Sequence, residues 1–206
     1  LGFALGQTPF EDDGEILAKG PNIMKGYYKN DKATEESIDA DGWFYTGDIG
    51  DFDNDGFLKI TDRKKSLIVT SGGKNIAPAP LENALITSVY IEQVVAIGDK
   101  RNFISALVTP NFEALEPYLK SKGHEGLSPS EMASHSDTMD LFSSEIESRM
   151  GSFPNYEKIK KFTVCNRLFE LERDEITPSL KIKRKVVAEN FKETIDSMYD
   201  NSETSK

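Results

Sequence analysis

The chain of 206 residues contains one cysteine, Cys165, and two histidines, His124 and His135. A single cysteine cannot form an internal disulfide, which agrees with a reducing compartment. Cys165 ends the apolar segment Phe162–Cys165, so we expect a buried and unreactive thiol. The histidines lie in a polar stretch without further ligands at metal-binding spacing. We assign them no role and expect no metal site.

Long apolar runs are also absent, since none reaches the roughly 18 residues that a membrane-spanning helix needs. The first residues, Leu1–Gly6, lack both the charged segment and the long apolar segment of a signal peptide. They lack an initiator methionine as well, and we expect the chain to be part of a longer protein. These observations favour a cytoplasmic location.

Positive charge is scarce, because the chain has 25 Lys and Arg residues but 35 Asp and Glu residues, which gives a formal net charge of −10. Phosphate neutralisation supplies most of a protein's affinity for nucleic acids, so we expect no nucleic-acid partner. Any anion must be held by a local basic site. The hydrophobic content of 37% is enough for a core in one large domain or two small ones.

Patterning predicts an α+β protein: an incomplete β-rich segment followed by a small α/β domain. Trp43–Tyr45 and Phe57–Ile60 are expected to pair across a turn, and Phe103–Val108 to pair antiparallel with Val94–Ile97. Strands are expected at 15–19, 66–69, 94–97, 103–108 and 161–165, and helices at 31–39, 80–89, 111–120, 137–150 and 183–199.

Two basic clusters are candidates for phosphate contact. The first, Asp62–Lys65, precedes an apolar strand and the glycine turn Thr70–Lys74. Basic side chains donate charge-assisted hydrogen bonds, and glycine lets a backbone approach a ligand. The second, Thr177–Lys185, precedes the last helix, and a lysine on such a loop can stabilise a developing phosphate charge. The alternatives are a solvated hairpin turn, a solvated helix start and a localisation-type basic patch.

Two acidic segments could bind a ligand, and for each of them an ordinary turn is the simpler interpretation. Residues 51–62 nearly fit the calcium loop of an EF-hand, but position 12 is Asp62 instead of glutamate and the flanks resemble strands. An Asp-Gly hairpin turn is therefore favoured over a calcium site. Tyr45–Asp48 places a carboxylate after an aromatic strand, which suits a ribose diol, although an ordinary strand-end turn has the same pattern.

Four segments of the chain, taken in their order along the sequence, resemble the C-terminal part of AMP-forming acyl-CoA synthetases. The Asp-Arg-Lys-Lys start, with Thr-Ser-Gly-Gly-Lys and Ala-Pro, is most similar to the long-chain fatty-acid branch. The resemblance covers nearly the whole chain. It implies a remnant of the N-terminal body over residues 1–62 and a mobile lid domain over 63–206, with a hinge near Lys65. The four segments are Gly14–Tyr28, Asp41–Asp48, Asp62–Lys65 and Ser71–Pro78.

The resemblance implies a long-chain fatty acid–CoA ligase, which joins a fatty acid to ATP as acyl-adenylate with release of pyrophosphate. CoA then takes the acyl group and AMP leaves. The implied cofactors are ATP, CoA and Mg²⁺, with the magnesium ligands, the phosphate loop and the acyl tunnel in an N-terminal body that these residues do not include. We therefore expect the 206 residues alone to be inactive. The resemblance leaves peripheral membrane contact of the parent protein open.

The resemblance also assigns roles to individual residues. Lys181 is the implied catalytic residue, bridging the carboxylate and the α-phosphate during adenylation. The other roles are ribose binding by Asp48, nucleotide contact by Arg63, the hinge at Lys65, and the thioester loop and CoA channel at Gly72, Gly73 and Lys74.

One position departs from the superfamily pattern, which usually has glycine before the catalytic lysine where this chain has Leu180. Lys183 therefore competes with Lys181 for the adenylation role. For the whole protein, the alternatives are another adenylate-forming ligase with a different acceptor and an acidic calcium-binding or regulatory module.

Overall fold

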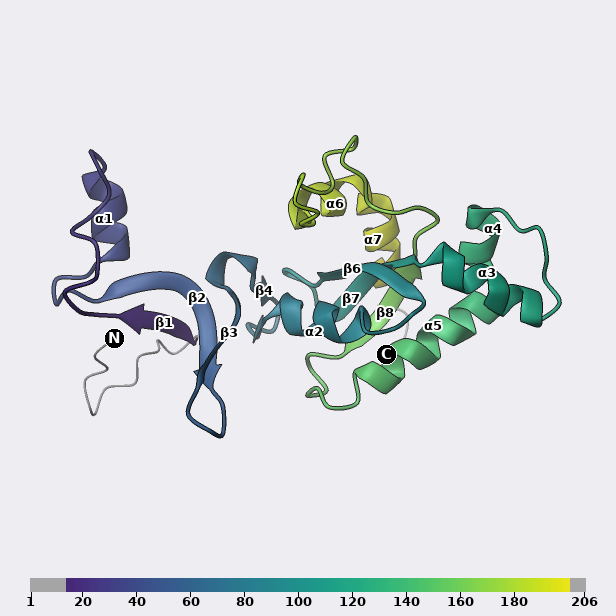
Figure 1. Ribbon diagram of the computed structural model, residues 1–206, viewed down its shortest axis with the longest axis horizontal. Helices are drawn as coiled ribbons and strands as arrows, with labels where there is room; N and C mark the ends of the chain where they lie inside the picture. The colour runs from purple at the N-terminus through teal and green to yellow at the C-terminus, as the bar shows by residue number, and fades with distance from the viewer. Residues whose placement is uncertain (1–13, 201–206) are drawn as a thin grey trace. The chain divides into compact units, whose positions relative to one another are not determined.

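The computed structural model describes residues 14–200, which form two compact units divided between Leu67 and Ile68 (Figure 1). Both units combine helices with β-sheet, so the expected α+β class is confirmed. The hinge assigned to Lys65 lies close to this division and stays a prediction. Leu1–Gly6 lie outside the described residues.

The first unit contains one antiparallel sheet in the order β1-β2-β3. Its strands are β1 (Glu15–Ala18), β2 (Phe44–Phe52) and β3 (Leu58–Arg63). Between β1 and β2 lies the short helix α1 (Asp31–Ser37), which begins after Asn30 because the Asn30 side chain accepts a hydrogen bond of 3.1 Å from Ala33 N.

The expected pairing of Trp43–Tyr45 with Phe57–Ile60 is wrong. Tyr45 pairs with Leu17 of β1, and β3 pairs with the far half of β2. The cause is that β2 continues past Tyr45 through Gly50. A Cβ at Gly50 would lie 2.4 Å from Lys59 O, so glycine is what lets β3 approach at this point.

The acidic segment 51–56 runs from the end of β2 into the turn of the β2–β3 hairpin, which confirms the hairpin interpretation over the calcium loop. The Asp53 carboxylate accepts hydrogen bonds from Asp55 N at 3.0 Å and Phe57 N at 2.9 Å, and Gly56 has a φ of +82°. The flanking helices that an EF-hand needs are replaced by two strands.

The second unit is built on the sheet β6-β7-β8, in which β7 is central and buried along its whole length. β6 (Ile91–Ile97) and β7 (Ile104–Pro110) are antiparallel, as expected, while β7 and β8 (Ile159–Val164) are parallel. A second, small sheet pairs β4 (Ile68–Val69) with β5 (Asn75–Ile76).

Helices cover both faces of this sheet (Figure 1). Ala106 and Val108 of β7 join a core with α2 (Pro78–Leu85), α3 (Phe112–Ser121) and α5 (Ser136–Arg149), whereas Leu107 joins a core with the last two helices. Successive side chains of β7 therefore point to opposite faces of the sheet, and each face is covered by its own layer of helices. The remaining helices are α4 (Pro129–Ser134), α6 (Arg184–Asn190) and α7 (Lys192–Asp200).

Three expected boundaries are corrected. The helix expected at 80–89 begins at Pro78, which occupies its first turn, where a missing N–H costs nothing. The strand expected at 66–69 begins at Ile68, because Lys64–Ser66 form a 3₁₀ turn, η1. The single helix expected at 183–199 is broken at Phe191, whose ring packs edge-on against Phe169 with centroids 5.8 Å apart.

Within residues 14–200, no helix combines the length and the apolar character that crossing a bilayer requires.

Candidate functional site

Asp48 and Arg63, the two residues predicted to contact a nucleotide, face each other across β2 and β3. Arg63 Nε donates to Asp48 Oδ1 at 2.8 Å. The Asp48 side chain is 26% exposed and that of Arg63 is 68% exposed. The guanidinium therefore orients a carboxylate that still has acceptor capacity for hydroxyl groups.

Glu15 holds the residues next to this pair through hydrogen bonds, and the sequence analysis missed it. It is buried, and its Oε1 accepts from Gly47 N at 2.8 Å while Oε2 accepts from Lys64 Nζ at 2.8 Å. One carboxylate thus fixes the residue before Asp48 and the residue after Arg63. The only sequence signal is a charged residue at an inward position of a strand.

Replacement of Glu15 by glutamine should lower the free energy of unfolding of the first unit by about 2 kcal/mol, because a buried charge-assisted hydrogen bond to Lys64 is lost. Urea denaturation followed at Trp43 measures it. Glu36→Gln is the control, since the Lys32–Glu36 pair is exposed and contributes little. Equal effects of the two substitutions would contradict the role given to Glu15.

In the second unit, the predicted thioester loop is the connection Thr70–Lys74 between β4 and β5. Thr70 closes it, since Thr70 N donates to Lys74 O at 3.0 Å and Thr70 Oγ1 accepts from Lys74 N at 3.2 Å. Gly73 has a φ of +75° and a Cβ there would meet no atom within 4 Å. Backbone conformation, not crowding, therefore requires this glycine.

The hairpin is attached to the turn between β6 and β7. Ser71 N donates to Arg101 O and Lys100 N to Val69 O, both at 2.8 Å. At the far end of the loop, Lys74 Nζ lies 5.5 Å from the centre of the Tyr156 ring. The base of the hairpin is held by main-chain bonds while the glycine tip is exposed.

Gly73→Ala should cost about 1 kcal/mol of stability, because alanine pays a steric penalty in the left-handed region. Gly72→Ala is the matched control: Gly72 does not have a positive φ, and a Cβ added to it would meet only Thr70 Oγ1, at 4.0 Å. Thermal denaturation of both variants measures the difference. A larger loss for Gly72→Ala would overturn the conformational argument.

The implied catalytic lysine lies in a tight loop closed by an antiparallel bridge between Ile176 and Ile182. Thr177 N donates to Lys181 O and Leu180 N to Thr177 O, both at 2.8 Å. Leu180 has a φ of +60° and is 77% exposed. The left-handed conformation gives a physical reason for glycine at the same position in the superfamily.

The two competing lysines differ in their surroundings. Lys183 Nζ forms an ion pair with Asp174, and its main-chain N donates to Glu175 O at 2.7 Å. Among residues 14–200, the exposed ammonium of Lys181 has no ion-pair partner. Lys181 is thus the more available of the two cations.

The entry to this loop is anchored by Glu175, whose side chain is fully buried. Both of its carboxylate oxygens accept from Arg167 at 2.7 Å, and Asn190 Nδ2 donates at 3.0 Å. Burial alone would raise the pKa of Glu175, but these hydrogen bonds, with one from Glu170 N, lower the pKa to about 2. The carboxylate is therefore ionised and fully paired at neutral pH.

The exit from the loop is anchored by Arg184. Its guanidinium donates to Glu82 Oε1 at 2.6 Å and to Ala96 O at 2.7 Å. Glu82 Oε1 also accepts from Ala96 N at 2.8 Å. The start of α6 is thus tied to α2 and β6, and the lysine loop is held at both ends.

Because the pKa of Glu175 is lowered from 4.5 to about 2, its contribution is present above pH 4.5 and is lost as the pH falls to about 2. We expect Glu175→Gln to cost about 3 kcal/mol at pH 7 and much less near pH 2. Denaturation at both pH values tests this. The exposed neighbour Glu172→Gln is the control and should change stability little at either pH.

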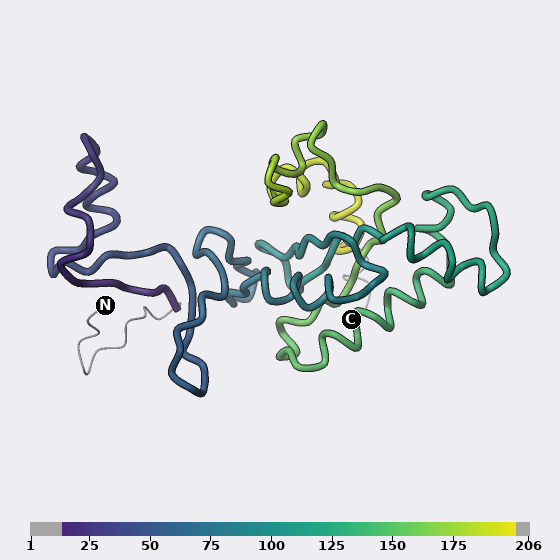
Figure 2. The backbone as a smooth tube through the Cα atoms, viewed as in Figure 1, coloured from purple at the N-terminus to yellow at the C-terminus, as the bar shows by residue number. Residues whose placement is uncertain are grey.

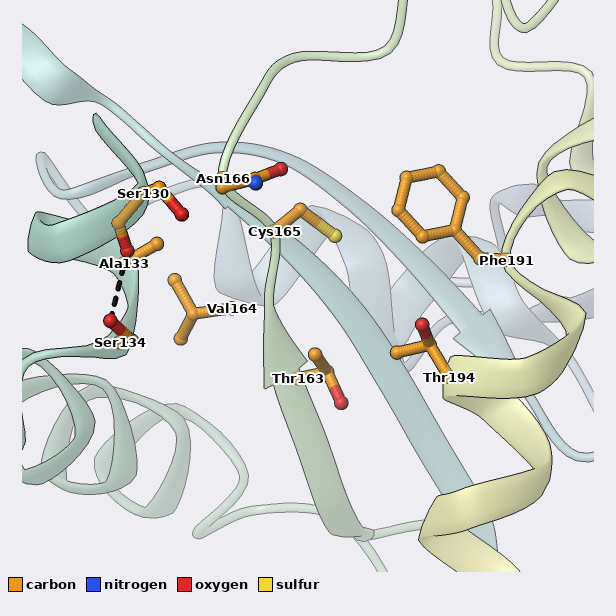
Figure 3. A pocket seen from close by; sticks show the side chains of 9 residues that line it. All are labelled: Ser130, Ala133, Ser134, Thr163, Val164, Cys165, Asn166, Phe191 and Thr194. Atoms are coloured by element: carbon orange, nitrogen blue, oxygen red, sulfur yellow. Dashed lines mark hydrogen bonds between the residues drawn. The ribbon is translucent and has the colours of Figure 1, made fainter. Parts of the chain in front are cut away.

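A separate pocket of about 290 Å³ opens between α4, the end of β8 and the α6–α7 junction (Figure 3). Cys165 lies in its wall, buried as expected, and burial raises the pKa of its thiol to about 12. Such a thiol is inert at neutral pH. None of the residues lining the pocket is charged: Ser130, Ala133, Ser134, Thr163, Val164, Cys165, Asn166, Phe191 and Thr194.

The site residues fall in different parts of the chain. Asp48 and Arg63 contact each other, whereas no hydrogen bond or ion pair within residues 14–200 joins Lys181 to the Thr70–Lys74 loop. A small α/β unit that carries a glycine hairpin and a lysine loop is what the resemblance to the C-terminal domain of AMP-forming enzymes predicts. The family model with the description "AMP-binding enzyme C-terminal domain" matches residues 65–203, and the chain belongs to this family.

Similar sequences include long-chain-fatty-acid–CoA ligases. The chain is 42% identical over 190 residues to FadD15 of Mycobacterium tuberculosis, covering 92% of this chain and 32% of that protein. It is 36% identical over 192 residues to ligase 6 of Rattus norvegicus, covering 91% and 27%. The chain thus spans about a third of the length of the curated relatives it matches.

Similar solved structures include the adenylation domain of a carboxylate reductase from Mycobacterium chelonae. The TM-score is 0.70 at 26% identity, covering 95% of this chain and 29% of that one. O-succinylbenzoate CoA synthetase from Bacillus subtilis, solved with AMP, has a TM-score of 0.51 at 30% identity, covering 83% and 29%. The fold is that of adenylate-forming enzymes.

Proposed function

We propose that the chain is the C-terminal part of a long-chain fatty acid–CoA ligase. The observation that carries the proposal is 36–42% identity to such ligases in both bacteria and animals over more than nine-tenths of the chain. Identity to the carboxylate reductase domain is lower, at 26%, which favours CoA as the acceptor. Fatty acid, ATP and CoA are the proposed substrates.

In the first step, the fatty-acid carboxylate attacks the α-phosphate of ATP and pyrophosphate leaves. Lys181 places a positive charge where the pentacoordinate phosphorus gains negative charge. Its free ammonium and the doubly anchored loop support this role, whereas Lys183 is engaged by Asp174. Asp48, oriented by Arg63, accepts hydrogen bonds from the ribose hydroxyls.

In the second step, the deprotonated CoA sulfur bonds to the acyl carbon while the bond from that carbon to the phosphate oxygen breaks, and AMP leaves with the bonding electron pair. The exposed tip at Gly72 and Gly73 offers main-chain groups without side chains, which suits close passage of a thioester. Lys74 lies beside this tip and can attract the phosphates of CoA. The two steps use different loops, so we assign the exchange between them to a hinge at Lys65, in the exposed η1 turn next to the unit division.

The described residues, 14–200, do not offer a ligand set that suits Mg²⁺. Mg²⁺ prefers carboxylate, carbonyl and water oxygens. Among residues 14–200, the one three-residue group with ligand atoms in reach of each other contains two imidazoles. The carboxylate Oδ1 atoms of Asp51 and Asp53 accept main-chain hydrogen bonds. No step is therefore assigned to Mg²⁺ through this chain.

In the full-length parent, Lys181→Ala should reduce adenylation by about 100-fold or more, because a charge aimed at the transition state is lost. Thioester formation from preformed acyl-adenylate should change little. Pyrophosphate release and single-turnover CoA transfer measure the two half-reactions. Lys183→Ala is the matched control and should leave adenylation nearly intact. Equal loss in both half-reactions for Lys181→Ala would show that another lysine acts.

A further inference from the structure

The fold gathers both histidines of the chain around one carboxylate. His124 Nε2 lies 2.9 Å from Asp137 Oδ2, and His135 Nδ1 lies 3.5 Å from the same oxygen. The two imidazole rings are 4.0 Å apart, centre to centre. The sequence shows no further ligand at metal-binding spacing, but the α3–α4 connection returns His124 to the start of α5, so the structure brings both rings to the Asp137 carboxylate.

His124 is held by the end of α3. Its main-chain N donates to Leu119 O at 3.0 Å, and Gly123 N donates to Lys120 O at 3.0 Å, with Gly123 at a φ of +93°. These two bonds form a Schellman motif, a defined helix end that fixes the residue after the glycine. The position of His124 is thus set by the backbone and not by a freely moving loop.

His135 and Asp137 lie at the junction of α4 and α5. Figure 2 shows the path of the backbone through this green part of the chain. His135 ends α4 and begins α5, and its Nδ1 accepts a hydrogen bond of 3.2 Å from Asp137 N. Asp137 lies in the first turn of α5. Both side chains therefore project from the ends of regular helices.

We propose that His124, His135 and Asp137 form a Zn²⁺ site. Two imidazoles and a carboxylate are a donor set that zinc accepts, and all three ligand atoms lie within 4.8 Å of one another. Tetrahedral Zn²⁺ with bonds near 2.1 Å separates its ligand atoms by about 3.4 Å. The separations of 2.9 and 3.5 Å bracket this value.

Access and charge are suitable for an ion. The side chains of His124, His135 and Asp137 are 35%, 22% and 31% exposed, so an ion can enter without unfolding. Asp137 supplies a negative charge that offsets the unfavourable positive end of the α5 dipole. Coordination through His135 Nδ1 replaces the hydrogen bond from Asp137 N. The loss of this bond limits the affinity for zinc, while the positions of the three side chains are kept.

The chain offers few competing zinc ligands. Both of its histidines belong to this site, and its one cysteine is buried in the core formed with α6 and α7. A bound ion would join the end of α3 to the start of α5 and so clamp two of the helices that cover one face of the sheet. This role is structural and separate from the acyl transfer chemistry.

Isothermal titration of the metal-free 206-residue chain with ZnCl₂ at pH 7.5 tests the proposal. We expect saturable binding of one ion and a higher thermal midpoint, because zinc binds the folded state. His124→Gln should weaken binding at least ~10-fold. Glu125→Gln, which changes the exposed neighbour that pairs with Lys120, is the control and should bind zinc like the unmodified chain.

A measurement on the unmodified chain does not depend on how a variant folds. With two histidines, ¹H–¹⁵N spectra of the imidazole nitrogens contain two ring systems, and both should shift on addition of zinc. Absence of saturable binding up to millimolar zinc would overturn the proposal. Saturable binding that leaves either ring unshifted, or that His124→Gln retains unchanged, would overturn it equally.

Discussion

The second unit depends on the buried ion pair between Glu175 and Arg167. It fixes the segment that leads into the lysine loop, and Arg184 with Glu82 fixes the segment that leaves it. A lysine that stabilises charge on a phosphorus atom must have a rigid base and a free ammonium. The two anchors supply the first, and the absence of an ion pair at Lys181 within residues 14–200 supplies the second. Buried ionic groups are costly, and here they constrain geometry.

The first unit uses the same arrangement on a smaller scale. Glu15 is buried next to the pair of half-buried Asp48 and exposed Arg63, and its two oxygens hold the main chain at Gly47 and the side chain of Lys64. In both units a buried carboxylate fixes the chain next to a residue that meets solvent. The residues proposed to act on substrate are thus placed by charges that do not contact it.

Local patterns predicted much of the secondary structure but not the contacts between distant segments. The apolar runs Val94–Ile97 and Phe103–Val108 and the cap at Asn111 were sufficient, because they depend on near neighbours. The predicted pairing of β2 was wrong, since the observed pairing depends on the close approach of β3 that Gly50 permits. The break at Phe191 depends on packing against Phe169.

The same limit applies to the sites. The resemblance to a family predicted roles for Asp48, Arg63 and Lys181, whereas the contact between Asp48 and Arg63 follows from the register of β2 and β3. Glu15 was missed because its partner Lys64 lies 49 residues away, and the cluster around Asp137 was missed because the turn after α3 decides where His124 lies. Long-range pairing of polar groups carries no periodic signal that a single sequence reveals.

The left-handed backbone at Leu180 has a practical consequence. Its side chain is 77% exposed, and the conformation is imposed by the surrounding main-chain bonds at a cost of about 1–2 kcal/mol. The shape of the loop is therefore independent of what the leucine contacts. Position 180 can accept a fluorescent probe, which would report the surroundings of the neighbouring lysine during turnover while leaving its placement intact.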